Sequence, residues 1–152
     1  MIVDASVILM AFFPDEAGQA QAQALIRAHA LGTIELRGPD LLAHEVTNAV
    51  LQAVRRKRIT LATAQEILTA FDDLMILLEP VAPVKVLTTA HRFGRSAYDA
   101  AYLTLAETLD TDFITGDRRL YNAVSGELPW VRWIGDYQAA DSLELDPGES
   151  RS

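Results

Sequence analysis

Short β-prone runs alternate with longer helical stretches along the whole chain, and this order restricts the fold more than any other feature of the sequence. Strands that are separated by helices pair in parallel, because each crossover returns the chain to the same edge of the sheet. At 152 residues, the chain is long enough to bury one substantial core. We therefore expect one α/β domain, a Rossmann-like three-layer α/β/α sandwich with a central parallel sheet.

Five segments carry the expected strands. The run Met1–Met10 predicts the first strand, which ends near Asp4 and passes into a loop through Ala5 and Ser6. The other strands are expected within 33–42, at 76–81, at 112–117, where the strand runs into a turn, and at 129–134. The carboxyl ends of such strands meet at one edge of the sheet, where proteins of this class bind their ligands.

Helices are expected between these strands. Asp40 and Thr60 are typical N-cap residues, and each directly precedes a stretch with helical periodicity. The expected helices span 15–30, about 41–57, 61–75, about 84–94 and 96–109, followed by a short one through Tyr121–Ala123.

The composition excludes several classes of protein. The chain has no cysteine, so it forms neither disulfide bonds nor thiolate metal sites, which fits a reducing cytosol. Its apolar start is not a signal peptide, because no basic region precedes it and because it carries Asp4. No apolar run reaches the roughly 20 residues of a membrane span. Since a glycine-rich phosphate loop is also absent, we expect a cytoplasmic protein with no membrane contact and no nucleotide cofactor.

The net charge of −8 disfavours a nucleic-acid partner at first sight, because phosphates attract cationic surfaces. The segment from Ala139 onward accounts for −3 of this charge, with four acids against Arg151. Basic residues also cluster, as in the run RRKR at 55–58, which is either a solvated helix end or a patch that contacts phosphates. The charge balance therefore permits a nucleic-acid partner without identifying one.

Four acidic residues stand at positions where a structural explanation competes with a functional one. Asp4 ends the first buried strand, where an unpaired charge is costly, and is otherwise explained as a turn residue or an N-cap. Asp99 forms a capping-box pattern with Ser96, and Asp117 can cap a short helix. Glu45 borders the apolar stripe of its helix and can keep its carboxylate in water.

These four acids are expected at the same edge of the sheet, since two of them end strands and two begin helices there. Carboxylates crowded together repel one another and have raised pKa values unless a cation lies among them. Oxygen ligands without cysteine or paired histidine suit a hard ion such as Mg²⁺ or Mn²⁺. Such an ion polarises a phosphoryl oxygen and lowers the pKa of bound water, which is the chemistry of phosphodiester hydrolysis.

The motifs IVDASVIL, HEVTNAVL, YDAAYLTLAE and FITGDRRL, in this order and spacing, resemble those of the PIN domain, and most of all the VapC-type toxins of bacterial toxin–antitoxin pairs. The resemblance extends from Met1 to about Asp136. It implies a nuclease domain over 1–136, and the acidic segment 137–152 is expected to be disordered because it has little to bury.

The resemblance assigns roles to particular residues. Asp4, Glu45, Asp99 and Asp117 match the acidic quartet that binds Mg²⁺ or Mn²⁺ in this family. The positions that support such a quartet match Ser6, Thr115 and Asn48, and Asn48 lies one helical turn from Glu45, which it is expected to orient. Two arginines and one further acid have weaker assignments. Arg118 and Arg119 are expected either to contact the RNA backbone or simply to be exposed arginines at the start of a helix. Asp112 is either an outer carboxylate of the site or, by preference, a turn residue before its strand.

The resemblance further implies a metal-dependent endoribonuclease that cleaves single-stranded or loop RNA, a homodimer, and inhibition by a small antitoxin protein. Three alternatives stay open: a PIN-domain nuclease in RNA maturation, a PIN-like domain that binds RNA or a partner without cleaving, and a phosphatase of the haloacid dehalogenase type. The last expects a second aspartate where this chain has Ser6. A small antitoxin gene immediately upstream would favour the toxin.

The three histidines are not assigned to the site. His29 and His91 are expected at the surface or at its boundary. His44 adjoins Glu45 but points about 100° away from it on a helix, so it is not assigned as a general base.

Overall fold

The strands form one parallel sheet in a computed structural model that describes residues 1–14 and 16–139. Within these residues the sheet has five strands in the order β3-β2-β1-β4-β5, and every pairing is parallel, as expected. The strands are short: β1 Ile2–Val3, β2 Arg37–Pro39, β3 Leu77–Glu79, β4 Phe113–Thr115 and β5 Val131–Trp133.

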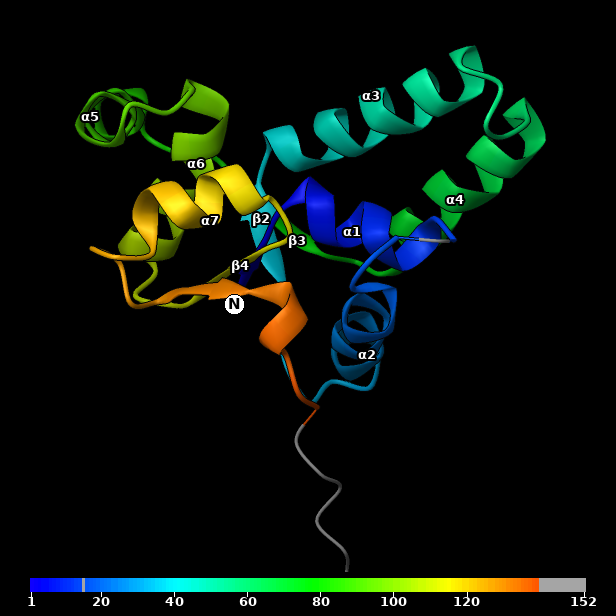
Figure 1. The fold of residues 1–152 in the computed structure, drawn as a ribbon, viewed down its shortest axis with the longest axis horizontal. Coiled ribbons are helices and arrows are strands. Elements are labelled where there is room, and N and C mark those ends of the chain that lie inside the picture. The colour runs from blue at the N-terminus through cyan, green and yellow to red at the C-terminus, as the bar shows by residue number, and fades with distance from the viewer. Residues whose placement is uncertain (15, 140–152) are drawn as a thin grey trace, which may run out of the picture.

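Helices cover both faces of this sheet, which confirms the three-layer α/β/α architecture (Figure 1). The chain steps from β1 to β2 to β3 in one direction and then returns to β4, so right-handed crossovers place α1–α4 on one face and α5–α7 on the other. The helices are α1 Ala5–Phe12, α2 Gln19–Ala30, α3 Leu41–Arg55, α4 Leu61–Asp73, α5 Pro83–Phe93, α6 Ala97–Thr108 and α7 Arg118–Val124, followed by the 3₁₀ turn η1 Ile134–Asp136.

The first strand ends at Val3, next to Asp4, where the sequence placed its end. The loop expected through Ala5 and Ser6, however, is the first turn of α1. The Asp4 carboxylate accepts a hydrogen bond from the Val7 backbone N–H at 3.3 Å and so caps this helix. An uninterrupted apolar run has no periodicity that separates a buried strand from a buried helix, which explains the error.

Other boundaries differ by smaller amounts. The second helix begins at Gln19 rather than at 15, because Gly18 adopts a left-handed conformation with φ of 89° just before it. Asp40 precedes α3 but makes no side-chain capping bond, so its predicted capping role is wrong. Thr60 does cap α4 by accepting from the Thr63 N–H.

The core is built around α6, which packs against α5 and against strands β1, β2 and β4. All seven residues from Ala100 to Ala106 are buried, an arrangement expected only for a central helix. The Tyr102 ring stacks on Phe113 of β4 with a centroid separation of 5.8 Å. This packing fixes the N-terminal turn of α6, and with it Asp99, relative to the sheet.

Two sequence predictions concern segments outside this core. The predicted acidic tail 137–152 lies outside the described residues from 140 onward. In the part of the chain that the structure describes, every helix is too short or too polar to cross a membrane.

Candidate active site

The site lies where the strand order reverses. Strand β1 connects to β2 on one side and pairs with β4 on the other, and crevices at such reversals are where open parallel sheets bind ligands. Asp4 follows β1 directly, and Asp117 follows β4 after Gly116. Helices α3 and α6 begin at the same edge and contribute Glu45 and Asp99. The structure thus brings all four acids to one pocket of about 350 Å³, which is lined by Asp4, Ala5, Ser6, Leu9, Glu45, Asn48, Ala49, Asp99, Tyr102 and Asp117.

Asp4 is the most deeply buried of the four, with 6% of its surface exposed. Both of its oxygens accept hydrogen bonds from hydroxyl groups: Ser6 Oγ donates to Oδ1 and Thr115 Oγ1 donates to Oδ2, each at 2.5 Å. Burial raises the pKa of Asp4 to about 6 against the opposing effect of these donors, and repulsion from Asp117 adds to the rise. An acid held this way is preorganised to bind a cation.

The two hydroxyl residues also connect the ends of β1 and β4. Ser6 Oγ accepts from the Gly116 N–H at 2.8 Å, and Thr115 Oγ1 accepts from the Asp117 N–H at 3.0 Å. A Cβ at Gly116 would meet the flexible end of the Met10 side chain, so a larger residue there would require Met10 to move. Ser6 and Thr115, which the sequence proposed as supporting residues, therefore hold Asp4 in place relative to the loop that carries Asp117.

Glu45 is positioned by a tyrosine that the sequence analysis missed. The Tyr102 hydroxyl donates to Glu45 Oε1 at 2.6 Å. Burial, followed by the neighbouring Glu45 carboxylate, raises the pKa of Tyr102 far above its ordinary value, so the phenol stays protonated and remains a donor. Asn48, which was expected to orient Glu45, lines the pocket, but the donor to Glu45 is Tyr102. The signal was the spacing of Asp99 and Tyr102, which places both on one face of α6.

Asp99 does not complete the capping box that its sequence suggested. The Ser96 hydroxyl accepts from the Asp99 N–H at 3.0 Å, which is half of that motif. The Asp99 carboxylate instead approaches Arg95, with 3.4 Å between Oδ2 and Nε. Burial raises the pKa of Asp99, Arg95 opposes this rise, and Asp117 adds to it. Capping therefore accounts for Ser96 but not for the side chain of Asp99.

Asp117 both caps a helix and lines the acidic pocket. Its Oδ1 accepts from the backbone N–H groups of Arg119 and Leu120 and caps α7, as the sequence suggested. The same carboxylate lines the acidic pocket. The capping explanation is therefore correct for Asp117 and does not exclude a second role.

The donor set of this pocket fits a hard divalent ion. Its four acids supply only oxygen ligands, and burial together with repulsion from Asp99 raises the pKa of Glu45. As the side chains lie, no three acidic or histidine residues within 1–14 and 16–139 are close enough together to hold one ion. Each carboxylate has a partner of its own: Ser6 and Thr115 for Asp4, Tyr102 for Glu45, Arg95 for Asp99, and the start of α7 for Asp117.

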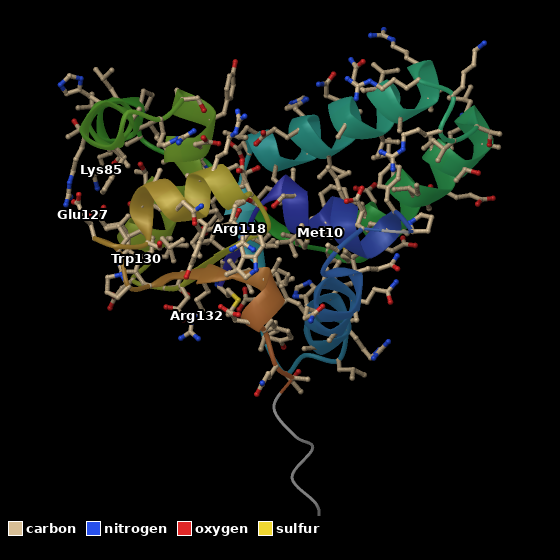
Figure 2. The ribbon with its side chains drawn as sticks, viewed as in Figure 1. Met10, Lys85, Arg118, Glu127, Trp130 and Arg132 are labelled. Carbon is tan, nitrogen blue, oxygen red and sulfur yellow. The ribbon has the colours of Figure 1, made fainter. Side chains whose placement is uncertain are left out.

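The weaker predictions lie outside the pocket. Arg118 places its guanidinium over the Trp133 ring, 3.8 Å from the centroid, and is labelled in Figure 2. Arg119 is exposed at the start of α7. Asp112 precedes β4 at the opposite edge of the sheet and pairs with Arg132, which favours the turn-residue interpretation.

The basic run 55–58 and the histidines also lie away from the acids. The run follows the C-terminal end of α3, about 15 Å along the helix from Glu45, and its Arg58 pairs with Glu16 at 3.7 Å. His29 joins α2 to its neighbours, because Nε2 meets the Leu74 carbonyl at 2.7 Å and Nδ1 accepts from the Leu36 N–H. His44 and His91 are exposed.

Known proteins resemble this chain in both fold and sequence. The sequence pattern of the PIN domain matches residues 1–125. Ribonuclease VapC9 of Mycobacterium tuberculosis is 30% identical over 129 residues, which cover 85% of this chain and 94% of that protein. Ribonuclease VapC3 of Pyrobaculum aerophilum is 31% identical over 124 residues, covering 79% and 91% respectively. The crystal structure of PAE2754 from Pyrobaculum aerophilum superposes with a TM-score of 0.67 at 25% identity and covers 88% of this chain and 89% of that one.

The fold and the site together define an α/β/α protein with an acidic pocket at the switch point of its sheet. Because the family pattern covers most of the chain, the protein belongs to the PIN domain family. Its similarity to VapC ribonucleases extends over nearly the whole length of those proteins.

Proposed function

We propose that this chain is a cytoplasmic endoribonuclease that depends on Mg²⁺ or Mn²⁺, cleaves single-stranded or loop RNA, and acts as the toxin of a toxin–antitoxin pair. The observation that carries the proposal is the convergence of four carboxylates in one pocket of a PIN domain. Similarity to proteins named as VapC ribonucleases supports RNA as the substrate and an antitoxin as a partner.

In this proposal Asp4, Glu45, Asp99 and Asp117 hold the ion, which when bound polarises the phosphoryl oxygen and makes water a stronger nucleophile. The chain contributes the positions of these ligands. Ser6 and Thr115 fix Asp4 through both of its oxygens, and Tyr102 fixes Glu45 through Oε1, leaving Oε2 available. Holding Asp4 and Glu45 in defined positions reduces the side-chain freedom that is lost when an ion binds, although the acids must still move closer together to share that ion.

Arg118 and Arg119 are proposed as contacts to the RNA backbone. Both lie at the start of α7, directly after Asp117. Stacking on Trp133 holds the Arg118 guanidinium in a defined place, and a cation fixed beside an acidic pocket can contact a phosphate without losing further side-chain freedom.

A homodimer is also part of the proposal. We propose that the exposed face of α5 binds a second copy of the chain. Although α5 is amphipathic, none of its residues is buried, and Val84 and Leu87 are 77% and 70% exposed. Beside it, an apolar groove of about 470 Å³ extends to the exposed ring of Tyr98 on α6. Exposed apolar surfaces of this kind mark protein interfaces.

Leu87→Glu is expected to convert the dimer to a monomer, because each copy would then carry a charge in an apolar interface. Light scattering after size-exclusion chromatography measures the mass, with Leu31→Glu at the end of α2 as the control, because Leu31 is similarly exposed at 73%. A Leu87→Glu protein with the mass of the wild type would contradict a dimer through α5.

The proposed function is tested by incubating a mixed single-stranded RNA pool with the protein in Mn²⁺, in Mg²⁺ and in EDTA, beside two variants. Asp99→Asn is expected to abolish cleavage while its melting temperature stays near that of the wild type. Ser96→Ala is the matched control, because it removes the cap of α6 at a cost of about 1 kcal/mol and keeps the Asp99 carboxylate. It is expected to melt earlier and to cleave normally.

The two variants separate metal chemistry from helix capping. Cleavage that requires metal and is lost only in Asp99→Asn supports the nuclease. Equal losses in both variants would mean that Asp99 acts through the helix. No cleavage by the wild type, together with no rise of its melting temperature in Mn²⁺, would favour a domain that binds without cleaving.

A further inference from the structure

Arg95 lies in the connection between α5 and α6, next to the acidic pocket. Gly94 ends α5 in a left-handed conformation with φ of 61°, and Ser96 caps α6, so the backbone of Arg95 is fixed on both sides. From there its guanidinium reaches back over the first turn of α6 to Asp99, and the two side chains are 26% and 27% exposed. The cation is therefore partly shielded from water at the mouth of the site.

Within 1–14 and 16–139, Arg95 is the one basic residue that forms an ion pair with any member of the acidic quartet. Its charge opposes the burial that raises the pKa of Asp99 and the repulsion from Asp117. The pocket thus contains its own counter-cation. A divalent ion that binds Asp99 must compete with this guanidinium for the same carboxylate oxygens.

The contact between Arg95 and Asp99 is incomplete. Nε is shielded from solvent and forms no hydrogen bond within the described residues, although Asp99 Oδ2 is 3.4 Å away. A guanidinium that pairs well with a carboxylate does so through two parallel hydrogen bonds, and its fork matches a phosphate equally well. Arg95 is therefore attracted to Asp99 by charge while its buried Nε–H lacks a good acceptor.

We propose that Arg95 is a displaceable counter-cation: it pairs with Asp99 in the metal-free protein and turns to a phosphate oxygen of the RNA once a divalent ion binds that carboxylate. This inference rests on the proposed function, since it requires both the ion and the RNA. It explains why the acids are held apart by partners of their own in the metal-free arrangement. Ion binding and RNA binding would be coupled through this one side chain.

The first arm of the test measures Mn²⁺ affinity by calorimetry in the absence of RNA. Arg95→Met keeps an unbranched aliphatic stem and removes the competing charge, so it is expected to bind Mn²⁺ at least about 5-fold more tightly than the wild type, the lower end of typical coupling between sites. Arg92→Met is the matched control. It removes the same charge three residues earlier, where Arg92 pairs with Glu127, labelled at the left edge of Figure 2.

The outcomes of this arm are distinct. Tighter binding in Arg95→Met with an unchanged Arg92→Met supports the proposal. Unchanged affinity in Arg95→Met would overturn it, and weaker affinity would overturn it by showing that Arg95 positions Asp99 for the ion. A wild-type protein that binds no Mn²⁺ would overturn the proposed function itself, so the two failures are distinguishable.

The second arm measures RNA affinity against salt concentration, with Ca²⁺ as the divalent ion and the RNA checked for integrity. One lost phosphate contact lowers the slope of log K against log salt by about 0.7 for a single strand. Arg95→Met is expected to show this loss in Ca²⁺ and to match the wild type in EDTA, while Arg95→Lys keeps the slope. Equal slopes for Arg95→Met and wild type in Ca²⁺ would overturn the phosphate contact.

Discussion

Asp4→Asn is expected to lower RNA cleavage at least ~10²-fold, the scale of removing a principal electrostatic element from an active site. Asparagine has nearly the same shape, so the packing at the end of β1 is retained. Its Oδ1 still accepts from the Ser6 hydroxyl and the Val7 N–H, and its amide can donate to Thr115. Only the charge is lost, and with it one ligand for the ion.

Initial rates on a labelled single-stranded RNA in saturating Mn²⁺ measure this effect. Asp112→Asn is the matched control, because it removes the same charge at the opposite edge of the sheet, where Asp112 pairs with Arg132. We expect its rate to stay within a few-fold of the wild type. A rate for Asp4→Asn as high as that of Asp112→Asn would contradict the assignment of Asp4 to the site.

The same substitution is expected to stabilise the metal-free protein at neutral pH. Burial raises the folded-state pKa of Asp4 to about 6, above its value of 3.8 in an exposed setting. The folded state therefore binds this proton more tightly than the unfolded state does, and stability that is present below pH 4 is lost as the pH rises toward 6. A shift of this size corresponds to about 2–3 kcal/mol, all of which is lost at pH 7.5.

Urea denaturation in EDTA at several pH values measures how the free energy of unfolding depends on the charge of Asp4. The free energy of unfolding of Asp4→Asn minus that of the wild type is expected to increase between pH 4 and pH 6.5 and then to level off. The comparison isolates Asp4, since Glu45 and Asp99, whose pKa values are also raised, remain in both proteins. Two parallel pH curves would show that Asp4 carries no such penalty.

The sequence predicted the sheet topology and the grouping of the four acids correctly, because both depend on the order of strands and helices along the chain. The parallel sheet followed from strands that alternate with helices, and the grouping of Asp4, Glu45, Asp99 and Asp117 followed from their places at strand and helix ends. Both depend on topology alone. Helix α1 was missed, because its residues other than Ser6 are all apolar and satisfy a buried helix as well as a buried strand.

One contact between distant segments and one local ion pair account for the rest of what was missed. Tyr102 and Glu45 are 57 positions apart, and no local pattern announces that a buried phenol meets that carboxylate. The local pattern offered the Ser96 backbone as a partner for the Asp99 side chain, which instead approaches Arg95, four residues earlier. The contact of Tyr102 with Glu45 depends on tertiary packing, whereas Ser96 and Arg95 are both local partners between which the spacing does not choose.

Two of the site's acids, Asp4 and Asp117, are also the residues that start α1 and α7. Alanine at either position removes a helix cap as well as a carboxylate, whereas asparagine is as good a cap as aspartate. A gene that decays from an active nuclease into an inert one therefore keeps its fold when it passes through asparagine and loses part of it when it passes through alanine. Descendants disarmed by asparagine would still present the same surface to whatever restrains the active form, and would act as decoys for it.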